Sequence, residues 1–498
     1  YVTRSYAVIN TAADEAALAR ACLYRARDPV LIALSSHDER NLAVARTICA
    51  SLEMMDKKAL RFNAFIMYTR LDRAEHFQFT QAAEGRIKFF NPYEIIARRF
   101  LARYPASSLI PKDFIDTGIA KLKKPYAINH IFVGFGNANM QILKKSIVID
   151  QLLGCDYRAL VIDSAVDDNE AAFMNSARGI FRSERGAPGG KDFFPEPEEK
   201  YAIEFAGMNV LSLEFYQRIT GQIMTGDFSI IIIALGDDKL STETAMEIRQ
   251  WAYEHNIPPE KMRIFVKLRK HSAITIDDVI NPNRNAGDIL IMPFGFEDMI
   301  FDFEHIFNED VDRLAKHIAE KYSGDAEFAT NWEKLSNYER DSNRYAALSI
   351  RVKLNLMGLD LIFDKTGTLS QNEKTLEEFV RAYGTHSIRN NLARLEHQRW
   401  NSSYLVNGWQ PMPKAEVTAQ SRKNQRTRKH ACITTFEGLD ELAKLQASLK
   451  TQNLTGAEKE AAYAAALREC DTMRLDFDQM DGLLGNLKET KYRIAGSS

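Results

Sequence analysis

The sequence predicts an α/β protein built from two parallel-sheet units in tandem, the first of them truncated, followed by an all-α region. Short apolar segments that run through a polar or glycine turn into a helical segment recur along residues 1–322. The same order of buried strand, polar turn and helix is found in residues 30–45 and again in residues 230–255, which indicates an internal repeat. After about residue 322 the strand signal disappears and helical segments follow.

Composition limits the class of protein. With 498 residues, 45% of them hydrophobic, the chain has room for about three domains with cores of ordinary size. A net charge of -2 argues against nucleic acid as the main partner. The 5 cysteines form no C-x-x-C pair, so we expect no metal site and no disulfide framework, and a cytoplasmic location. No apolar run approaches the length of a membrane-spanning helix.

A glycine turn after the strand at residues 131–133 is the first candidate site. Gly134 would form the tight turn, and Gly136 and Asn137 would let backbone N–H groups approach a phosphate at the N-terminus of the helix that follows. This pattern is typical of the first β-turn-α of a Rossmann unit. Asn139 occupies the position of the third glycine, which loosens the match.

An acidic residue follows at the distance expected for a ribose-binding group. Asp163 ends the strand at residues 158–163, and Gly236 and Asp237 follow the strand at residues 230–235. We expect these residues to form a nucleotide site with Gly134, Gly136 and Asn137. The alternative is a Rossmann-shaped scaffold with an empty crevice, because a fold does not fix a function.

The two units differ in completeness. We expect a truncated unit over residues 1–115 and a complete one over residues 125–322, because the first lacks the strands that precede the repeated half. A sheet without its first strand would expose an apolar edge, so we expect the natural protein to begin upstream of Tyr1, with a membrane or oligomerising segment. The alternative is a degenerate unit whose edge another element covers. Residues 182–197 are expected to form a loop near the crevice, either a surface insertion or a lid.

The tandem units resemble the Trk and RCK type of nucleotide-binding domain, found on the cytoplasmic side of potassium channels and transporters. The turns at residues 33–41 and 234–238, with Gly134, Gly136 and Asp163, carry the resemblance over roughly residues 1–310. It implies a site for NAD(H), NADP(H), ATP or ADP, with phosphates at Gly134, Gly136 and Asn137 and a ribose at Asp163. It also implies a homo-oligomer whose conformation follows the bound nucleotide.

The end of the chain carries a second resemblance. After a helical connector at residues 323–384, residues 385–498 are similar to the ryanodine-receptor repeat (RyR) domain, a small helical module also found in bacterial and phage proteins. The similarity lies in a Glu-His-x-Arg-Trp helix, a Gly-Trp turn and a later Lys-His element. These motifs supply the candidate ligand-binding residues Glu396, His397, Arg399, Trp400, Trp409, Arg428, Lys429 and His430.

The spacing of these residues admits two interpretations. Glu396, Trp400 and Tyr404 share one helix stripe, and aromatic rings at that spacing more often form a core than a ligand platform. The basic side chains around them could instead bind phosphate while Trp400 or Trp409 stacks on a base. The basic run at residues 422–429 becomes a candidate anion site only if the fold brings it to the aromatic pair.

The function predicted from the sequence is ligand sensing. We find no nucleophile–base pair, no metal-ligand helix and no Walker loop, so no catalytic residue is assigned and an enzyme is not expected. We expect the cytoplasmic part of a channel-like or transporter-like protein, or a defence or stress effector, whose RyR-like domain recognises a phosphate-bearing nucleotide-type molecule. A nicotinamide-dependent oxidoreductase and a non-catalytic interaction scaffold are the alternatives.

Overall fold

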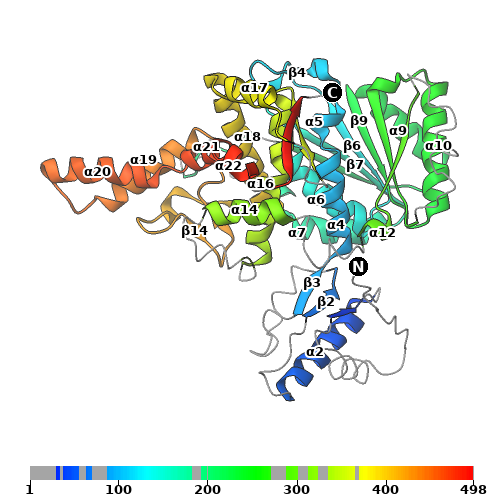
Figure 1. The fold of residues 1–498 in the computed structure, drawn as a ribbon, viewed down its shortest axis with the longest axis horizontal. Coiled ribbons are helices and arrows are strands. Elements are labelled where there is room, and N and C mark those ends of the chain that lie inside the picture. The colour runs from blue at the N-terminus through cyan, green and yellow to red at the C-terminus, as the bar shows by residue number, and fades with distance from the viewer. Residues whose placement is uncertain are drawn as a thin grey trace.

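The computed structural model describes most of the chain from residue 87 onward and shorter stretches before it (Figure 1). The described residues are 30–33, 37–54, 63–69, 87–181, 192–198, 200–270, 288–300, 312–322, 332, 335–364, 370–488 and 490–496. Most of the expected loop at residues 182–197 therefore lies outside the described residues.

A parallel six-stranded sheet forms the centre of the α/β part. Its order is β11-β10-β9-β6-β7-β8. The chain therefore begins with the central strand β6, adds β7 and β8 on one side, and then adds β9, β10 and β11 on the other side. This is the strand order of a Rossmann-type sheet. A ligand crevice is expected at the carboxyl ends of β6 and β9, where the strand order reverses. The strands are β6 (Ile128–Val133), β7 (Tyr157–Asp163), β8 (Tyr201–Gly207), β9 (Phe228–Ile233), β10 (Met262–Lys267) and β11 (Ile291–Phe294).

Helices cover both faces of this sheet. Alternate residues of the central strands enter two different cores, with Ile231 and Ile233 on one face and Ile230 and Ile232 on the other. The first face packs against α9 (Leu213–Thr225) and α10 (Asp238–Glu254). The second face packs against α4 (Pro92–Arg103), α6 (Asn137–Ile149) and helices of the C-terminal part (Figure 1). Burial on both faces explains why the strands are nearly continuous apolar runs.

The remaining elements of the α/β part are short or flank the sheet. The helices are α2 (Asp38–Met54), α4 (Pro92–Arg103), α5 (Ala106–Leu109), α6 (Asn137–Ile149), α7 (Val166–Ser176), α8 (Arg178–Phe181), α12 (Glu297–Ile300), η1 (Lys112–Phe114) and η2 (Pro259–Lys261). A two-stranded pair consists of β4 (Ile115–Asp116) and β5 (Lys121–Leu122).

A separate three-stranded parallel sheet precedes the large one in sequence. It consists of β1 (Val30–Ala33), β2 (Asn63–Met67) and β3 (Ile87–Phe90) in that order. Its register matches that of β9-β10-β11. Val30 pairs with Asn63 as Ile230 pairs with Arg263, and Ala64 pairs with Ile87 as Ile264 pairs with Ile291. The two sets of strands thus share order, direction and register.

The two sets of strands also share an equivalent side-chain hydrogen bond. The carboxylate of Asp38, at the start of α2, accepts the backbone N–H of Thr69 at 3.0 Å. The carboxylate of Asp238, at the start of α10, accepts the backbone N–H of Arg269 at 3.0 Å. In both places an acid after one strand holds the loop after the neighbouring strand, so the internal similarity extends to tertiary contacts.

The C-terminal part is mainly helical, but it is not all-α as the sequence predicts. Its helices are α14 (Arg313–Tyr322), α16 (Asn337–Leu356), α17 (Glu373–Tyr383), α18 (His386–Leu405), α19 (Gly438–Lys450), α20 (Gly456–Cys470), α21 (Met473–Asp481), α22 (Leu483–Lys488) and η5 (Lys414–Glu416). It also contains β12 (Leu359–Phe363) paired with β16 (Tyr492–Gly496), and β13 (Gln410–Pro411), β15 (Lys429–His430) and β14 (Lys423–Asn424). These pairs join segments far apart in sequence, which local periodicity does not detect.

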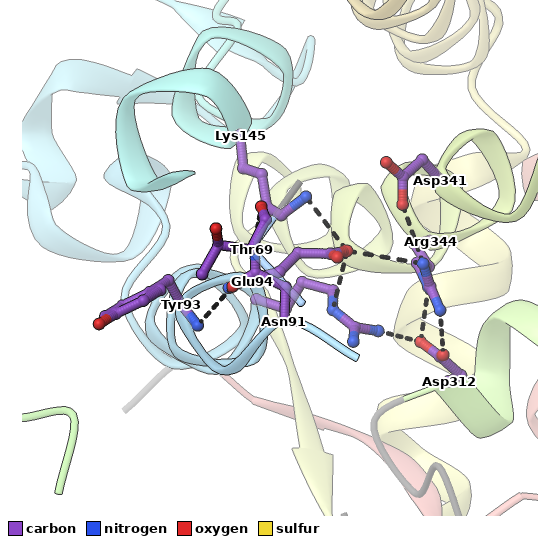
Figure 2. A network of polar contacts seen from close by, with 9 residues as sticks. Thr69, Asn91, Tyr93, Glu94, Lys145, Asp312, Asp341 and Arg344 are labelled. Atoms are coloured by element: carbon purple, nitrogen blue, oxygen red, sulfur yellow. Dashed lines mark hydrogen bonds and ion pairs between the residues drawn. The ribbon is translucent and has the colours of Figure 1, made fainter. Parts of the chain in front are cut away.

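A buried ion network joins the α/β part to the helical part (Figure 2). Glu94 on α4 lies 3.4 Å from the ammonium of Lys145 on α6 and 3.5 Å from the guanidinium of Arg344 on α16. Asp312 binds Arg344 at 2.6 Å and also binds Arg98. Burial by itself would raise the pKa of Glu94, but Lys145, Arg98 and Arg344 together hold it well below its usual range. The network therefore keeps both acids ionised inside the protein.

Candidate ligand-binding sites

The predicted glycine turn has the geometry of a phosphate-binding turn. Gly134 has a φ of 82°, and a Cβ there would meet the carbonyl oxygen of Ala234 at 2.5 Å, so only glycine fits. Gly136 is the N-cap residue of α6, and a Cβ there would meet nothing within 4 Å. No side chain caps the N-terminus of α6, and Gly136 and Asn137 are exposed. The helix end can therefore accept an anion.

Asn139 replaces the third glycine with a set of hydrogen bonds. Its side chain is fully buried, and its amide nitrogen donates to the carbonyl oxygens of Gly134 at 2.6 Å, Val133 at 3.1 Å and Ile232 at 3.2 Å. These bonds connect α6 to both central strands. The departure from the glycine pattern thus stabilises the turn rather than blocking it.

Asp163 lies beside the turn, as the sequence predicts. Its carboxylate accepts the backbone N–H of Phe135 at 2.6 Å and that of Ala165 at 2.8 Å. Each carboxylate oxygen has a second lone pair, so the half-buried group can still accept a ribose hydroxyl. Asp163 therefore shapes the turn as well as being available to a ligand.

Gly236 and Asp237 lie on the neighbouring loop at the same edge of the sheet. β9 pairs with β6 in parallel, so the two loops leave adjacent strands. Gly236 has a φ of 83° and open space around it. Asp237 caps α10 by accepting the N–H of Leu240 at 2.7 Å. The six predicted residues thus lie at the ends of three neighbouring strands, at one edge of the sheet.

Three of the predicted tail residues are instead buried and bonded to other groups of the protein. The carboxylate of Glu396 on α18 accepts two bonds from Arg399, at 3.0 Å and 2.7 Å, and one from Lys353 of α16 at 2.7 Å. Burial opposes ionisation, but Arg399 and Lys353 lower the pKa of Glu396 to about 2. The ring nitrogens of His397 lie 3.2 Å from the carboxylate of Asp476 and 2.9 Å from the carbonyl oxygen of Thr434. These side chains hold α18 in place.

Trp400, Trp409 and His430 form an aromatic cluster with Tyr404 and Tyr338. The ring of Tyr404 lies 4.1 Å from Trp400, 5.2 Å from Trp409 and 5.1 Å from His430, measured between centroids. Trp409 is buried and Trp400 half-buried. Of the two aromatic residues of the α18 stripe, Tyr404 is buried, as the core interpretation predicts, and Trp400 is half-buried.

The fold does bring the basic run to this cluster. The ammonium of Lys423 lies 4.9 Å from the ring centroid of Trp409 and 5.9 Å from those of Tyr404 and Tyr338. The side chains of Arg428 and Lys429 make other contacts. The exposed Arg428 donates to the carbonyl oxygen of Asn407 at 3.3 Å, and Lys429 pairs with Glu416 at 2.5 Å.

A cavity of about 770 Å³ lies next to the cluster, and we call it the tail cavity. Its lining includes Arg422, Lys423 and His430 from the strand region, and Gln446 and Lys450 from α19. His430 is the one member of the predicted tail set that lines it. Burial, and then Lys423 and Arg422, lower the pKa of His430 to about 3, so its ring is neutral near pH 7. Its Nδ1 accepts the N–H of Cys432 at 3.1 Å, which leaves the proton on Nε2.

Gln446 adds a specific hydrogen-bonding group. Its amide nitrogen donates to the carbonyl oxygen of Thr418 at 3.3 Å, and its buried Oε1 has no partner. Sequence reasoning missed Gln446 and Lys450, because nothing in the spacing along α19 marks them. They reach the cavity only through the packing of α19 against the segment around Arg422.

No family model, curated protein or solved structure matches the chain. Within the described residues, no group of His, Cys, Asp and Glu side chains is arranged to hold a metal ion. None of the helices in the described stretches is both long and apolar enough to cross a membrane.

Proposed function

We propose that this chain is a ligand-sensing regulatory protein whose tail cavity binds a phosphate-bearing, nucleotide-type small molecule. The tail cavity carries the proposal, because three cationic side chains, Arg422, Lys423 and Lys450, line it beside the aromatic cluster. Arg422 and Lys423 have no ion-pair partner among the described residues, and Lys450 pairs with Glu469 at 2.6 Å. Phosphate would occupy the cationic side.

The open turn at the sheet supports a second nucleotide site. The uncapped N-terminus of α6 and the carboxylate of Asp163 suit the pyrophosphate and ribose of NAD(H) or NADP(H), or the equivalent groups of ATP or ADP. We propose that β1-β2-β3 is the second half of a truncated unit of the same kind, as its shared register suggests. The arrangement would then be that of tandem Trk/RCK-type units followed by an RyR-like domain.

The proposed output is regulation rather than catalysis. In this proposal the chain acts in the cytoplasm as a homo-oligomer, as the nucleotide-binding part of a channel-like or transporter-like protein or of a defence or stress effector. The two sites would influence each other through their different affinities for two conformations. α6, which begins at the turn, also carries Lys145 of the ion network that reaches α16 (Figure 2).

Calorimetric titration with ATP, ADP, NAD(H), NADP(H) and ADP-ribose tests the two sites separately. For the tail cavity, Arg422→Met and Lys450→Met should weaken binding of the recognised nucleotide at least tenfold. Lys444→Met is the matched control, because Lys444 is also on α19 and also ion-paired, to Asp440 at 2.6 Å, but lies outside the cavity lining. Equal binding by all three variants would contradict the tail site.

For the sheet site, Gly136→Asp places a negative charge where the phosphate would lie. The new side chain has room, and aspartate is a favoured N-cap residue, so the variant should fold at least as stably as the parent. Nucleotide binding at this site should nevertheless be lost through repulsion. Unchanged affinity would exclude the site, and steady consumption of NADH with a small carbonyl compound would support an oxidoreductase instead.

A further inference from the structure

A second cavity, of about 250 Å³, lies where the helical part meets the α/β part, and we call it the junction cavity. Lys121 of β5 and Glu198 contribute to its lining from the α/β part. Arg394 and Asn401 of α18 and Glu437 contribute from the helical part. The two parts are fixed to each other around it, since Gln398 donates to Gln151 at 2.8 Å. Neither proposed nucleotide site includes these residues.

Asn401 brings a buried polar side chain to this lining. Its side chain is 1% exposed, and its amide nitrogen donates to the carbonyl oxygen of Thr434 at 2.9 Å. That bond fixes the orientation of the amide and holds α18 against the segment around Thr434.

The charges around the cavity indicate the kind of occupant. Arg394 and Glu437 form an ion pair with each other. Lys121 and Glu198 have no ion-pair partner among the described residues. The cavity therefore offers one positive and one negative group to a ligand, and a molecule with both charges would pair with both.

The junction cavity is smaller than the tail cavity, at about 250 Å³ against about 770 Å³. It is slightly below the range of about 300–1,000 Å³ typical of pockets for drug-sized ligands. A small zwitterion fits both the volume and the charges.

We propose that the junction cavity binds a free α-amino acid. The ammonium group would pair with Glu198, and the carboxylate would pair with Lys121. Because the lining comes from both parts of the chain, the bound amino acid would hold the helical part against the α/β part. This site is independent of the proposed nucleotide sites.

Calorimetry and thermal melting of the full chain with each of the common amino acids, at millimolar concentrations, test the proposal. At least one should bind with a stoichiometry of one and raise the melting temperature. Its N-acetyl and methyl ester derivatives, which each lack one charge, should bind at least tenfold more weakly. Absence of saturable binding by every amino acid would overturn the proposal and leave a cavity that holds water only.

Substitutions in the lining test whether the amino acid binds in the junction cavity. Lys121→Met and Glu198→Gln should each weaken binding of the amino acid at least tenfold. Lys123→Met is the matched control, because this exposed lysine lies two residues away and outside the lining. Binding that is equal in the variants and the control would place the amino acid elsewhere and overturn the proposal. If a variant fails to fold, binding of the amino acid and its two derivatives to the parent chain still tests the proposal.

Discussion

Asn139 shows how one side chain can take over the structural role of a glycine. The third glycine of the usual pattern allows a helix to pack closely on its strand. Here the amide of Asn139 fills that junction and donates to three carbonyl oxygens of the turn and the two central strands. The substitution is conspicuous in the sequence, but its effect depends on carbonyl groups that include Ile232, far away along the chain.

His430 gives a prediction about pH at the same scale. Its pKa is about 3 in the folded protein, chiefly because of burial, and about 6.5 in an unfolded chain. Its contribution to stability is therefore fully present above about pH 6.5 and is lost as the pH falls towards 3. Within that window the unfolded state binds one more proton, so stability should fall by about 1.4 kcal/mol per pH unit from this residue.

Urea unfolding of the His430→Gln variant at several pH values measures this effect. Between pH 6 and pH 4 its stability should fall less steeply than that of the parent, since glutamine does not titrate. His386→Gln, a change at an exposed histidine, should follow the parent. Parallel curves for the parent and His430→Gln would show that the ring is accessible to protons.

At the scale of elements, α4, α6 and α16 are joined by charges rather than by apolar contacts alone (Figure 2). Lys145 approaches the carboxylate of Glu94 at 3.4 Å, and its ammonium lies 5.4 Å from the ring centroid of Tyr345. Lys145→Met should cost about 3 kcal/mol, because it leaves a buried carboxylate with fewer cations. Chemical unfolding of Lys145→Met, Glu94→Gln and the double variant measures the coupling, which should be at least about 1 kcal/mol.

The control for this prediction is an exposed pair. Lys444 and Asp440 on α19 form an ion pair at 2.6 Å in contact with solvent, so Lys444→Met should leave the free energy of unfolding almost unchanged. Strictly additive effects of Glu94→Gln and Lys145→Met would mean that the two groups do not interact energetically.

At the scale of the whole molecule, the helical part packs closely against the α/β part. Gly179 of α8 lies against the backbone of α18 and the turn after it, where an added Cβ would meet the carbonyl oxygens of Trp409 at 2.3 Å and Leu405 at 2.4 Å. Gly179→Ala should therefore cost about 1–3 kcal/mol in unfolding experiments. It should also increase hydrogen exchange of the amides at residues 405–409.

Gly221→Ala provides the comparison. Gly221 lies within α9, and a Cβ there meets nothing within 4 Å, so the substitution should be neutral or stabilise by up to about 1 kcal/mol. If both variants unfold like the parent, the contact between α8 and α18 can adjust without cost, and the helical part is less firmly fixed than the distances indicate.

Elements whose environment is periodic can be predicted from the sequence. The apolar runs of β6 and β9 predict strands buried on both faces, and the glycines and Asp163 predict a tight turn after β6 and an acid at the end of the neighbouring strand. The repeated order of segments also predicts strands β1-β2-β3 in the order of β9-β10-β11. Each of these features depends on neighbours within one strand, turn or helix, and the sequence contains those neighbours.

Which polar side chains line a cavity depends on how distant segments of the chain pack together. Spacing places Glu396 and Trp400 on one stripe of α18, but it does not say that Lys353 and Arg399 cover the carboxylate. The tail cavity is lined by segments around residues 422, 446 and 470, and β12 pairs with β16 from the end of the chain. Periodicity defines the faces of a helix, whereas burial depends on which distant segment packs against each face.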